Sequence, residues 1–244
     1  MTNKEFIAKN QFSIKKMNND TKLKKLTKKW FNRSSLFQYS YHFTWLGLPI
    51  IQFPQDIIAL QEIIWRVKPD LIIETGIARG GSLIFSASML EMINEDGHVL
   101  GIDIDIRQEN RLAIENHPMS KRITMLEGSS IDKNIAEKVY EVARNKNRTL
   151  IILDSNHTHE HVLEELNLYA KLTSVDSYCI VFDTVVEDMP KKWDWGPRTW
   201  GVGNNPKTAV FEFLKTNDNF EIDKSIDNKL LISVAPDGYL KRIK

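Results

Sequence analysis

Acidic residues follow a series of short apolar runs in this sequence, each near the point where a run ends. They are Glu74, Asp103, Glu127, Asp154 and Asp183. Runs of this kind form strands that are buried on both faces of a sheet. The carboxyl ends of parallel strands meet at one edge, which is where such sheets bind ligands. The pattern therefore predicts one pocket that contains several carboxylates.

A glycine-rich segment, 74–82 (ETGIARGGS), joins the first of these runs to the helix expected after it. It matches neither the GxGxxG dinucleotide pattern nor a phosphate loop, since no lysine precedes Ser82. The acid at its start also disfavours a bound phosphate and suits a cationic ligand. A tight structural turn is the competing interpretation. We expect the segment to bind a cofactor through Glu74, Thr75, Gly76, Gly80, Gly81 and Ser82.

Two further turns extend this predicted site. Asp103 ends the second run, where an acid binds both hydroxyls of a ribose. Gly128, Ser129 and Ser130 follow the third run, where an adenine ring would lie. The set describes a pocket for an adenosine whose other end is positively charged, and S-adenosylmethionine fits that description. NAD or a nucleotide is disfavoured because the phosphate loop is missing.

The segments that position these residues alternate between strands and helices. Strands are expected at 70–74, 97–103, 122–127, 149–154 and 177–183. Helices are expected at 54–67, 82–94, 108–116, 131–144, 159–171 and 205–215, and a hairpin at 229–234 and 239–243. This alternation predicts an α/β fold with a mostly parallel sheet and a C-terminal antiparallel hairpin.

Composition is typical of one globular domain. The 244 residues are 42% hydrophobic and 27% charged, and no apolar run approaches the roughly 18 residues of a membrane span. The first residues lack a signal-peptide core, so a cytoplasmic location is expected. The one cysteine, Cys179, lies in an apolar run and is expected to be a buried small hydrophobe rather than a nucleophile.

Charge is concentrated at the start of the chain. Residues 1–33 hold ten lysines and arginines against two acids, a net +8, so the rest of the chain carries −7 of the total +1. We therefore divide the chain into a basic N-terminal arm, 1–40, and a domain, 41–244. The arm is expected to be a solvated leader or helix without a sustained apolar stripe, with an anionic membrane, an acidic glycan or a partner subunit as alternative contacts. Nucleic acid is disfavoured because the domain is acidic.

Several motifs resemble the cephalosporin hydroxylase / rhamnosyl O-methyltransferase family. They cover roughly residues 41–243 and include 45–49 (WLGLP), 54–56 (PQD), 68–76 (KPDLIIETG), 79–82 (RGGS), 101–105 (GIDID), 154–162 (DSNHTHEHV) and 236–240 (PDGYL). The resemblance implies a doubly wound, Rossmann-like methyltransferase fold that uses S-adenosylmethionine and a divalent metal, usually magnesium. It also implies a hydroxyl acceptor on a sugar or secondary metabolite, and a homo-oligomer.

The expected metal ligands are Asp154 and Asp183, because they end neighbouring strands and carboxylate oxygens suit magnesium. The family often has Glu-Asp at the end of the fifth strand, with both acids serving the metal. This chain has Phe182-Asp183 there. Metal binding is therefore weakened, rebuilt from another residue or absent. Asp154 is also expected to be essential for catalysis.

Three histidines follow Asp154. His157 is placed to take the proton of an acceptor hydroxyl, and a structural role at the helix start is its alternative. His159 and His161 are expected to start the helix and face outward. A zinc site is disfavoured, since the three histidines occupy every second position on a turn and no cysteine accompanies them.

An aromatic loop, 193–204 (WDWGPRTWGVGN), lies between the fifth strand and the last helix. Its tryptophans suggest either a lid that stacks on a sugar or rings that pack on the domain or on a second subunit. The sequence thus predicts an O-methyltransferase for a saccharide or glycosylated metabolite. The alternative is an S-adenosylmethionine-binding partner subunit that has lost catalysis, which Phe182 favours.

Overall fold

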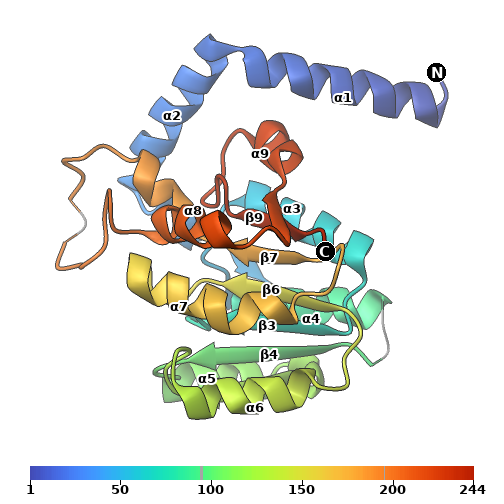
Figure 1. The fold of residues 1–244 in the computed structure, drawn as a ribbon, viewed down its shortest axis with the longest axis vertical. Coiled ribbons are helices and arrows are strands. Elements are labelled where there is room, and N and C mark those ends of the chain that lie inside the picture. Colours follow the sequence, from blue (N-terminus) through green and yellow to red (C-terminus); the bar gives the residue numbers. More distant parts are fainter. Residues whose placement is uncertain (94–95, 195) are drawn as a thin grey trace.

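A seven-stranded sheet forms the centre of the computed structural model, which describes residues 1–93, 96–194 and 196–244 (Figure 1). Its strands are β3 (Leu71–Thr75), β4 (His98–Asp103), β5 (Ile123–Glu127), β6 (Thr149–Leu153), β7 (Tyr178–Val181), β8 (Phe220–Ile222) and β9 (Tyr239–Arg242). The strand order is β5-β4-β3-β6-β7-β9-β8. The first five in that order are parallel, and β9 is antiparallel to both of its neighbours.

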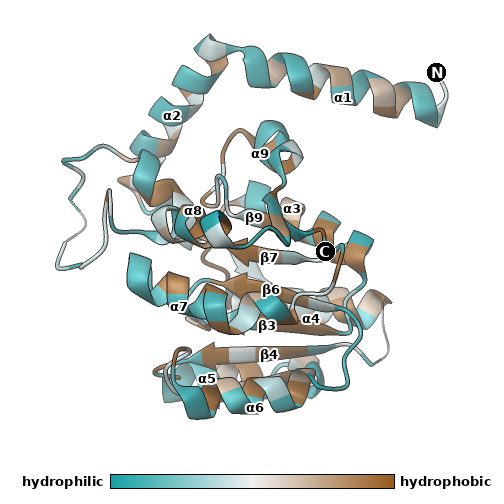
Figure 2. Cartoon of the chain, in the orientation of Figure 1, coloured by the Kyte–Doolittle hydropathy of each residue, from teal (hydrophilic) through white to brown (hydrophobic). Residues whose placement is uncertain are grey.

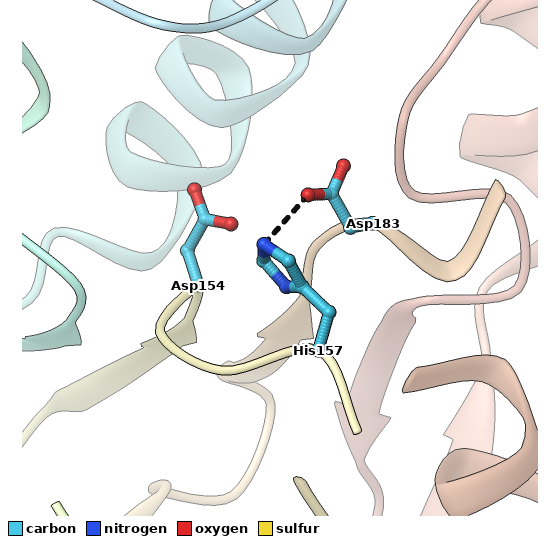
Figure 3. Close-up of side chains that lie close together, drawn as sticks. All are labelled: Asp154, His157 and Asp183. Atoms are coloured by element: carbon cyan, nitrogen blue, oxygen red, sulfur yellow. Dashed lines mark ion pairs between the residues drawn. The ribbon is translucent and has the colours of Figure 1, made fainter. Parts of the chain in front are cut away.

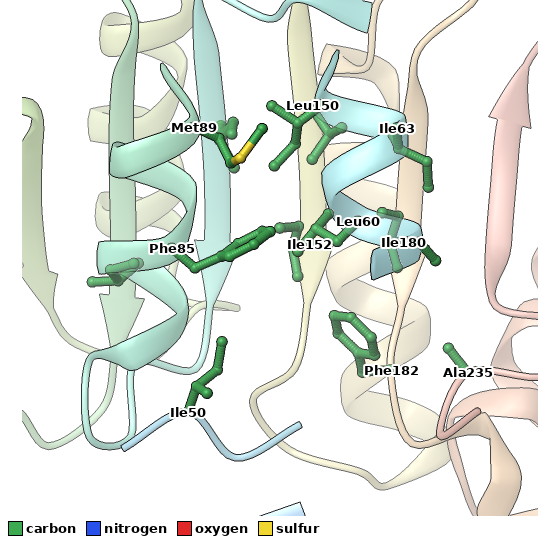
Figure 4. Close-up of a cluster of buried hydrophobic side chains, with 14 of the residues drawn as sticks. Ile50, Leu60, Ile63, Phe85, Met89, Leu150, Ile152, Ile180, Phe182 and Ala235 are labelled. Atoms are coloured by element: carbon green, nitrogen blue, oxygen red, sulfur yellow. The ribbon is translucent and has the colours of Figure 1, made fainter. Parts of the chain in front are cut away.

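Helices cover both faces of the sheet. On one face lie α3 (Pro54–Val67), α4 (Gly81–Ile93) and α5 (Gln108–Glu115), and on the other α6 (Lys133–Ala143), α7 (His159–Tyr169) and α8 (Pro206–Thr216). Every residue of β3 and β6 is buried, which explains their uninterrupted apolar sequences. Figure 4 shows part of the first core, where Leu60 and Ile63 of α3 lie near Ile152 and Leu150 of β6.

Shorter elements complete the chain. They are β1 (Thr44–Trp45), β2 (Leu48–Pro49), α9 (Lys224–Leu230) and 3₁₀ helices at Tyr39–His42, Pro118–Arg122, Ala170–Leu172 and Thr184–Asp188. β1 and β2 pair with each other as a small antiparallel ribbon.

The direction of winding changes between β3 and β6. From β3 the chain adds β4 and β5 on one side of the sheet, and then returns to add β6 and β7 on the other. Ligands of open α/β sheets bind beyond the carboxyl ends of the strands at such a switch point. The predicted doubly wound α/β fold is confirmed. A ligand site is therefore expected beside the residues that follow β3, β4, β5, β6 and β7.

One expected strand near the C-terminus differs from the structure. The expected strand at 229–234 is wrong, because Lys224–Leu230 form α9, which Asp223 caps by accepting a hydrogen bond from the backbone N–H of Ser225. The antiparallel partner of β9 is instead β8, earlier in the chain. The expected helix end at Asn94 lies outside the described residues, and α4 is described to Ile93.

The basic arm contains two helices, α1 (Asn3–Asn19) and α2 (Thr21–Ser35). α1 runs along one end of the molecule, is largely hydrophilic and buries no residue (Figures 1 and 2). α2 buries Phe31, whose ring stacks on Phe53 with centroids 5.1 Å apart. The expected solvated helix therefore describes α1, whereas α2 is mostly exposed but buries Phe31.

Two general expectations can be compared with this structure. Cys179 is fully buried in β7, as expected. Within the described ranges, no helix is both long and apolar enough to cross a membrane.

Candidate functional site

Two adjoining pockets lie at the carboxyl edge of the sheet. The sheet-edge pocket, of about 430 Å³, is bordered by residues after β3, β4, β5 and β6. The arm-side pocket, of about 560 Å³, is bordered by α2, the segment 38–41, the residues before α3 and the loop after β7. The two share a wall made of Ala78, Asp154, Ser155, His157, Arg198 and Trp200.

Four of the predicted cofactor residues border the sheet-edge pocket: Gly76, Asp103, Ser129 and Ser130. The Asp103 carboxylate also accepts hydrogen bonds from the backbone N–H groups of Ile77, at 2.8 Å, and Ala78, at 3.2 Å. The end of β4 thus fixes the loop after β3. Sequence reasoning brings these four residues together correctly, and their role as ligands stays a prediction.

Gly76 shows why this loop needs glycine. Its φ is +90°, and a Cβ there would lie 2.1 Å from the carbonyl oxygen of Asp154. The loop after β3 therefore passes directly against the end of β6, which only glycine allows. The remaining predicted residues of the turns, Thr75, Gly80, Gly81 and Gly128, border neither pocket in the described structure.

Glu74 and Ser82 lie beneath the loop. Glu74 is buried, and the hydroxyl of Ser82 donates a hydrogen bond to its Oε1. Burial raises the pKa of Glu74 to about 7, although the bond from Ser82 acts in the opposite direction. Both residues border a small cavity of about 10 Å³, together with Gln52, Asp154 and Phe182. Glu74 therefore lies behind the site rather than on the wall of the sheet-edge pocket.

Asp154, His157 and Asp183 form one cluster on the shared wall and beside it (Figure 3). One ligand atom from each lies within 4.8 Å of the others. Asp154 follows β6, Asp183 follows β7, and His157 lies on the turn before α7. His157 Nε2 lies 3.0 Å from Asp183 Oδ2. The predicted convergence of the two carboxylates and the histidine is therefore present.

The two carboxylates differ electrostatically. Burial, followed by repulsion from Asp183 and Glu74, raises the pKa of Asp154 well above its ordinary value. Burial also acts to raise the pKa of Asp183, but the charge and hydrogen bond of His157, with Arg198, outweigh it and leave that pKa below its ordinary value. Negative charge is thus balanced at Asp183 and unbalanced at Asp154.

This donor set fits a divalent cation. Two carboxylates provide hard oxygen ligands, and a cation between them would relieve the repulsion that Asp154 experiences. Phe182 adds no ligand: its ring is 3% exposed and lies in the apolar cluster with Leu60 and Ile152 (Figure 4). The site therefore offers Asp154 and Asp183, with His157 beside them.

The aromatic loop covers part of this wall. The Trp200 ring meets the His157 ring edge to face, with centroids 5.2 Å apart, and the Arg198 guanidinium lies 4.7 Å from the Trp200 ring. Trp193 borders the arm-side pocket and also packs against the first core. Trp195 lies outside the described residues. The rings of the loop therefore pack on the domain and border the pockets, and a lid that stacks on a sugar stays a prediction.

The outer histidines differ from each other. His159 starts α7, and its Nδ1 lies 2.9 Å from the hydroxyl of Thr208. The expectation that His161 faces outward is wrong: its Nε2 lies 2.9 Å from the hydroxyl of Ser130, and it borders the sheet-edge pocket. Ser130 lies on the turn after β5, so this contact directs the His161 side chain inward.

Sequence reasoning missed two groups of pocket residues. Gln52 donates a hydrogen bond from Nε2 to Asp154 Oδ2, at 3.0 Å. Its signal in the sequence is a lone polar residue within the apolar segment 50–53. The other group, Phe31, Ser35 and Gln38, comes from the arm and borders the arm-side pocket. No motif marks these three.

Comparisons with known proteins agree with this geometry. The family model described as Rhamnosyl O-methyltransferase/CmcI matches residues 37–243. The chain is 29% identical to a rhamnosyl O-methyltransferase of Mycobacterium tuberculosis over 203 residues, which cover 82% of this chain and 78% of the relative. It is 28% identical to one of Mycobacterium leprae over 200 residues, 82% of each chain.

Solved structures share the fold. A structure of CmcI described with Mg and SAM has a TM-score of 0.59 and 20% identity, and the match covers 84% of this chain and 78% of that one. A putative O-methyltransferase from Klebsiella pneumoniae has a TM-score of 0.52 and 15% identity, with 80% of each chain covered.

Proposed function

Because this chain belongs to the Rhamnosyl O-methyltransferase/CmcI family, we propose that it transfers a methyl group from S-adenosylmethionine to a hydroxyl of a saccharide or glycosylated metabolite, with assistance from magnesium. The family assignment confirms the resemblance carried by the sequence motifs and makes the chain an O-methyltransferase. The finer proposal rests on the shared wall: Asp154 and His157 border both pockets, so the donor and the acceptor meet beside them.

The sheet-edge pocket is the proposed donor site. Asp103 would accept hydrogen bonds from the ribose hydroxyls, and Ser129 and Ser130 would lie beside the adenine. Glu74 would offset the positive sulfur from beneath the loop. The residues that border neither pocket, Thr75, Gly80, Gly81 and Gly128, would shape the turns rather than touch the donor, and Ser82 would hold Glu74.

The arm-side pocket is the proposed acceptor site. Tyr39, Tyr41, Trp193 and Trp200 border it, and aromatic rings with polar neighbours suit the apolar faces of sugars. The names of the curated relatives support a saccharide acceptor. The arm, 1–40, would then contribute to acceptor binding through Phe31, Ser35 and Gln38. Homo-oligomer formation and a cytoplasmic location stay predictions.

Asp154 and Asp183 are the proposed magnesium ligands. The bound ion would supply positive charge that lowers the pKa of the acceptor hydroxyl. His157 borders both pockets, and its contact with Asp183 would hold the imidazole ring where it can accept the hydroxyl proton. Methyl transfer forms the new C–O bond as the C–S bond breaks, and the electron pair stays on sulfur. Alignment of the two pockets is the main contribution of the protein.

Calorimetry and turnover test the proposal together. Wild-type protein should bind S-adenosylmethionine and methylate a rhamnosyl or related glycoside, and EDTA should remove the activity until Mg²⁺ is added back. Asp154→Ala should lower kcat by about 1000-fold or more, since positioning and charge both depend on this residue. The affinity of this variant for S-adenosylmethionine should stay within about 3-fold of wild type, which is under 0.7 kcal/mol.

Two outcomes would contradict this proposal. Full activity of Asp154→Ala in EDTA would reject the metal-assisted mechanism. Binding of S-adenosylmethionine without turnover on any glycoside would favour the partner subunit without catalysis, the alternative that Phe182 supports.

A further inference from the structure

Gln52 is a buried polar side chain in an apolar connector. It lies between β2 and α3, is only 6% exposed, and is flanked by Ile50, Ile51 and Phe53. Its Nε2 donates to Asp154 Oδ2 at 3.0 Å. Gln52 also borders both the arm-side pocket and the small cavity behind the site. The connector therefore places the Gln52 amide in direct contact with the Asp154 carboxylate on the shared wall.

Folding alone does not explain this amide. Gln52 Oε1 is buried and has no hydrogen-bond partner within residues 1–93, 96–194 and 196–244. A buried amide oxygen left without a partner is destabilising, and an apolar residue of similar size would avoid that cost. The hydrogen bond to Asp154 distinguishes Gln52 and points to a role in the site.

The environment of Asp154 indicates that role. Phe182 contributes only an apolar ring to the cavity that Gln52, Glu74 and Asp154 also border. One hydrogen bond from Gln52 to Oδ2 holds the Asp154 carboxylate, which belongs to the candidate cation cluster. Groups that hold a ligating carboxylate in this way tune the affinity of a metal site.

We propose that Gln52 is a positioning residue of the cation site, which orients the Asp154 carboxylate and compensates for the apolar residue at position 182. The inference rests on the proposed function. It predicts opposite effects of Gln52→Leu: weaker cation binding, but a fold that is as stable as wild type or more stable without the cation.

The test measures Mn²⁺ binding by electron paramagnetic resonance for wild type, Gln52→Leu and Gln55→Leu. Gln55 is a matched control, because its Oε1 is also buried without a partner among the described residues, but Gln55 borders neither pocket. Gln52→Leu should raise the Kd for Mn²⁺ by about 10- to 100-fold. Gln55→Leu should leave it unchanged. In turnover, Gln52→Leu should raise the KM for Mg²⁺ more than it lowers kcat at saturating Mg²⁺.

Thermal unfolding in EDTA and calorimetry with S-adenosylmethionine complete the test. Gln52→Leu should unfold at a temperature no lower than that of wild type, and it should bind S-adenosylmethionine with the same affinity as wild type. If it fails to fold, Gln52→Asn, which keeps the amide but shortens its reach, should show the same loss of Mn²⁺ affinity. Equal Mn²⁺ affinity in wild type and the Gln52 variant would overturn the inference alone. Absence of Mn²⁺ binding by wild type would overturn both this inference and the metal part of the proposed function.

Discussion

The sheet-edge pocket and the arm-side pocket share a wall but are built differently. The sheet-edge pocket is formed mainly by residues that directly follow strands, such as Gly76, Asp103 and Ser129. The arm-side pocket is formed mainly by connectors, by α2 and by the aromatic loop, as with Phe31, Tyr41 and Trp193. A rigid sheet edge suits a constant ligand, whereas loops on the same frame allow the other ligand to vary. The difference supports the proposed assignment of the donor to the first pocket and of the acceptor to the second.

Charge separates the two pockets as well. Beneath the loop of the sheet-edge pocket, burial raises the pKa of Glu74 to about 7. At the arm-side pocket, burial also acts on Asp183, but His157 and Arg198 leave its pKa below the ordinary value. The pKa of Glu74, beside the proposed donor pocket, is thus raised, and that of Asp183, beside the proposed acceptor pocket, is lowered. A cationic donor would favour ionisation of Glu74 and so gain affinity from it.

The largest expected effect on the donor side is that of Asp103→Ala. This change removes the acceptor for the ribose hydroxyls and for the backbone N–H groups of Ile77 and Ala78. Hydrogen bonds to a charged group contribute about 1.5–3 kcal/mol each, so loss of two should raise the Kd for S-adenosylmethionine by about 1000-fold. Calorimetry measures this value.

Asp105→Ala is the matched control for that change. Asp105 lies two residues further along and is exposed, with its nearest cation, Arg107, at 3.9 Å. The control should bind the donor as wild type does. Comparable losses in both variants, or none in Asp103→Ala, would break the assignment of the donor to the sheet-edge pocket.

The next largest effect is the pH dependence that Glu74 gives to stability. Its pKa is about 7 in the folded protein and 4.5 ordinarily. Between these values the folded state keeps a proton that the unfolded chain loses, so stability falls as the pH rises through this window. The Glu74→Gln variant lacks this penalty. The free energy of unfolding of the variant relative to that of wild type should therefore increase by about 3 kcal/mol between pH 4.5 and pH 8. Denaturant titrations without ligands measure this difference.

Asp183→Asn is the counterpart from the other pocket, and it should show the opposite sign. The lowered pKa of Asp183 means that its charge stabilises the fold above the ordinary value of 3.8. The variant should be less stable than wild type at pH 7, and the difference should shrink as the pH falls below 4. The same sign for both variants would contradict the electrostatic contrast between the pockets.

The sequence predicts the donor side far better than the acceptor side. Strands such as β3 and β6 are uninterrupted apolar segments, and strand ends locate Gly76, Asp103 and Asp154 without any tertiary information. The acceptor side depends on long-range packing that no local pattern encodes. Phe31 reaches its pocket only because α2 folds back and stacks on Phe53.

The mispredicted elements have the same physical origin. The place of His161 in the first turn of a helix predicts an outer face, but its ring contacts Ser130 on the turn after β5. The segment 229–234 has the apolar content of a strand, yet the cap at Asp223 starts a helix that includes its first residues. In both cases a tertiary contact or a cap decides what local composition leaves open.

The smallest expected effect tests the acceptor side through Tyr41. This ring borders the arm-side pocket and is half exposed, so it can stack on a sugar without repacking the core. Tyr41→Ala should raise the KM for a glycoside by about 10-fold, the equivalent of about 1.4 kcal/mol, and leave the Kd for S-adenosylmethionine unchanged. Phe37→Ala is the control, because Phe37 is another exposed ring, four residues earlier, that borders neither pocket. An unchanged KM in Tyr41→Ala, or equal increases in both variants, would remove the acceptor from this pocket, since stacking is local and a ring outside the pocket cannot provide it.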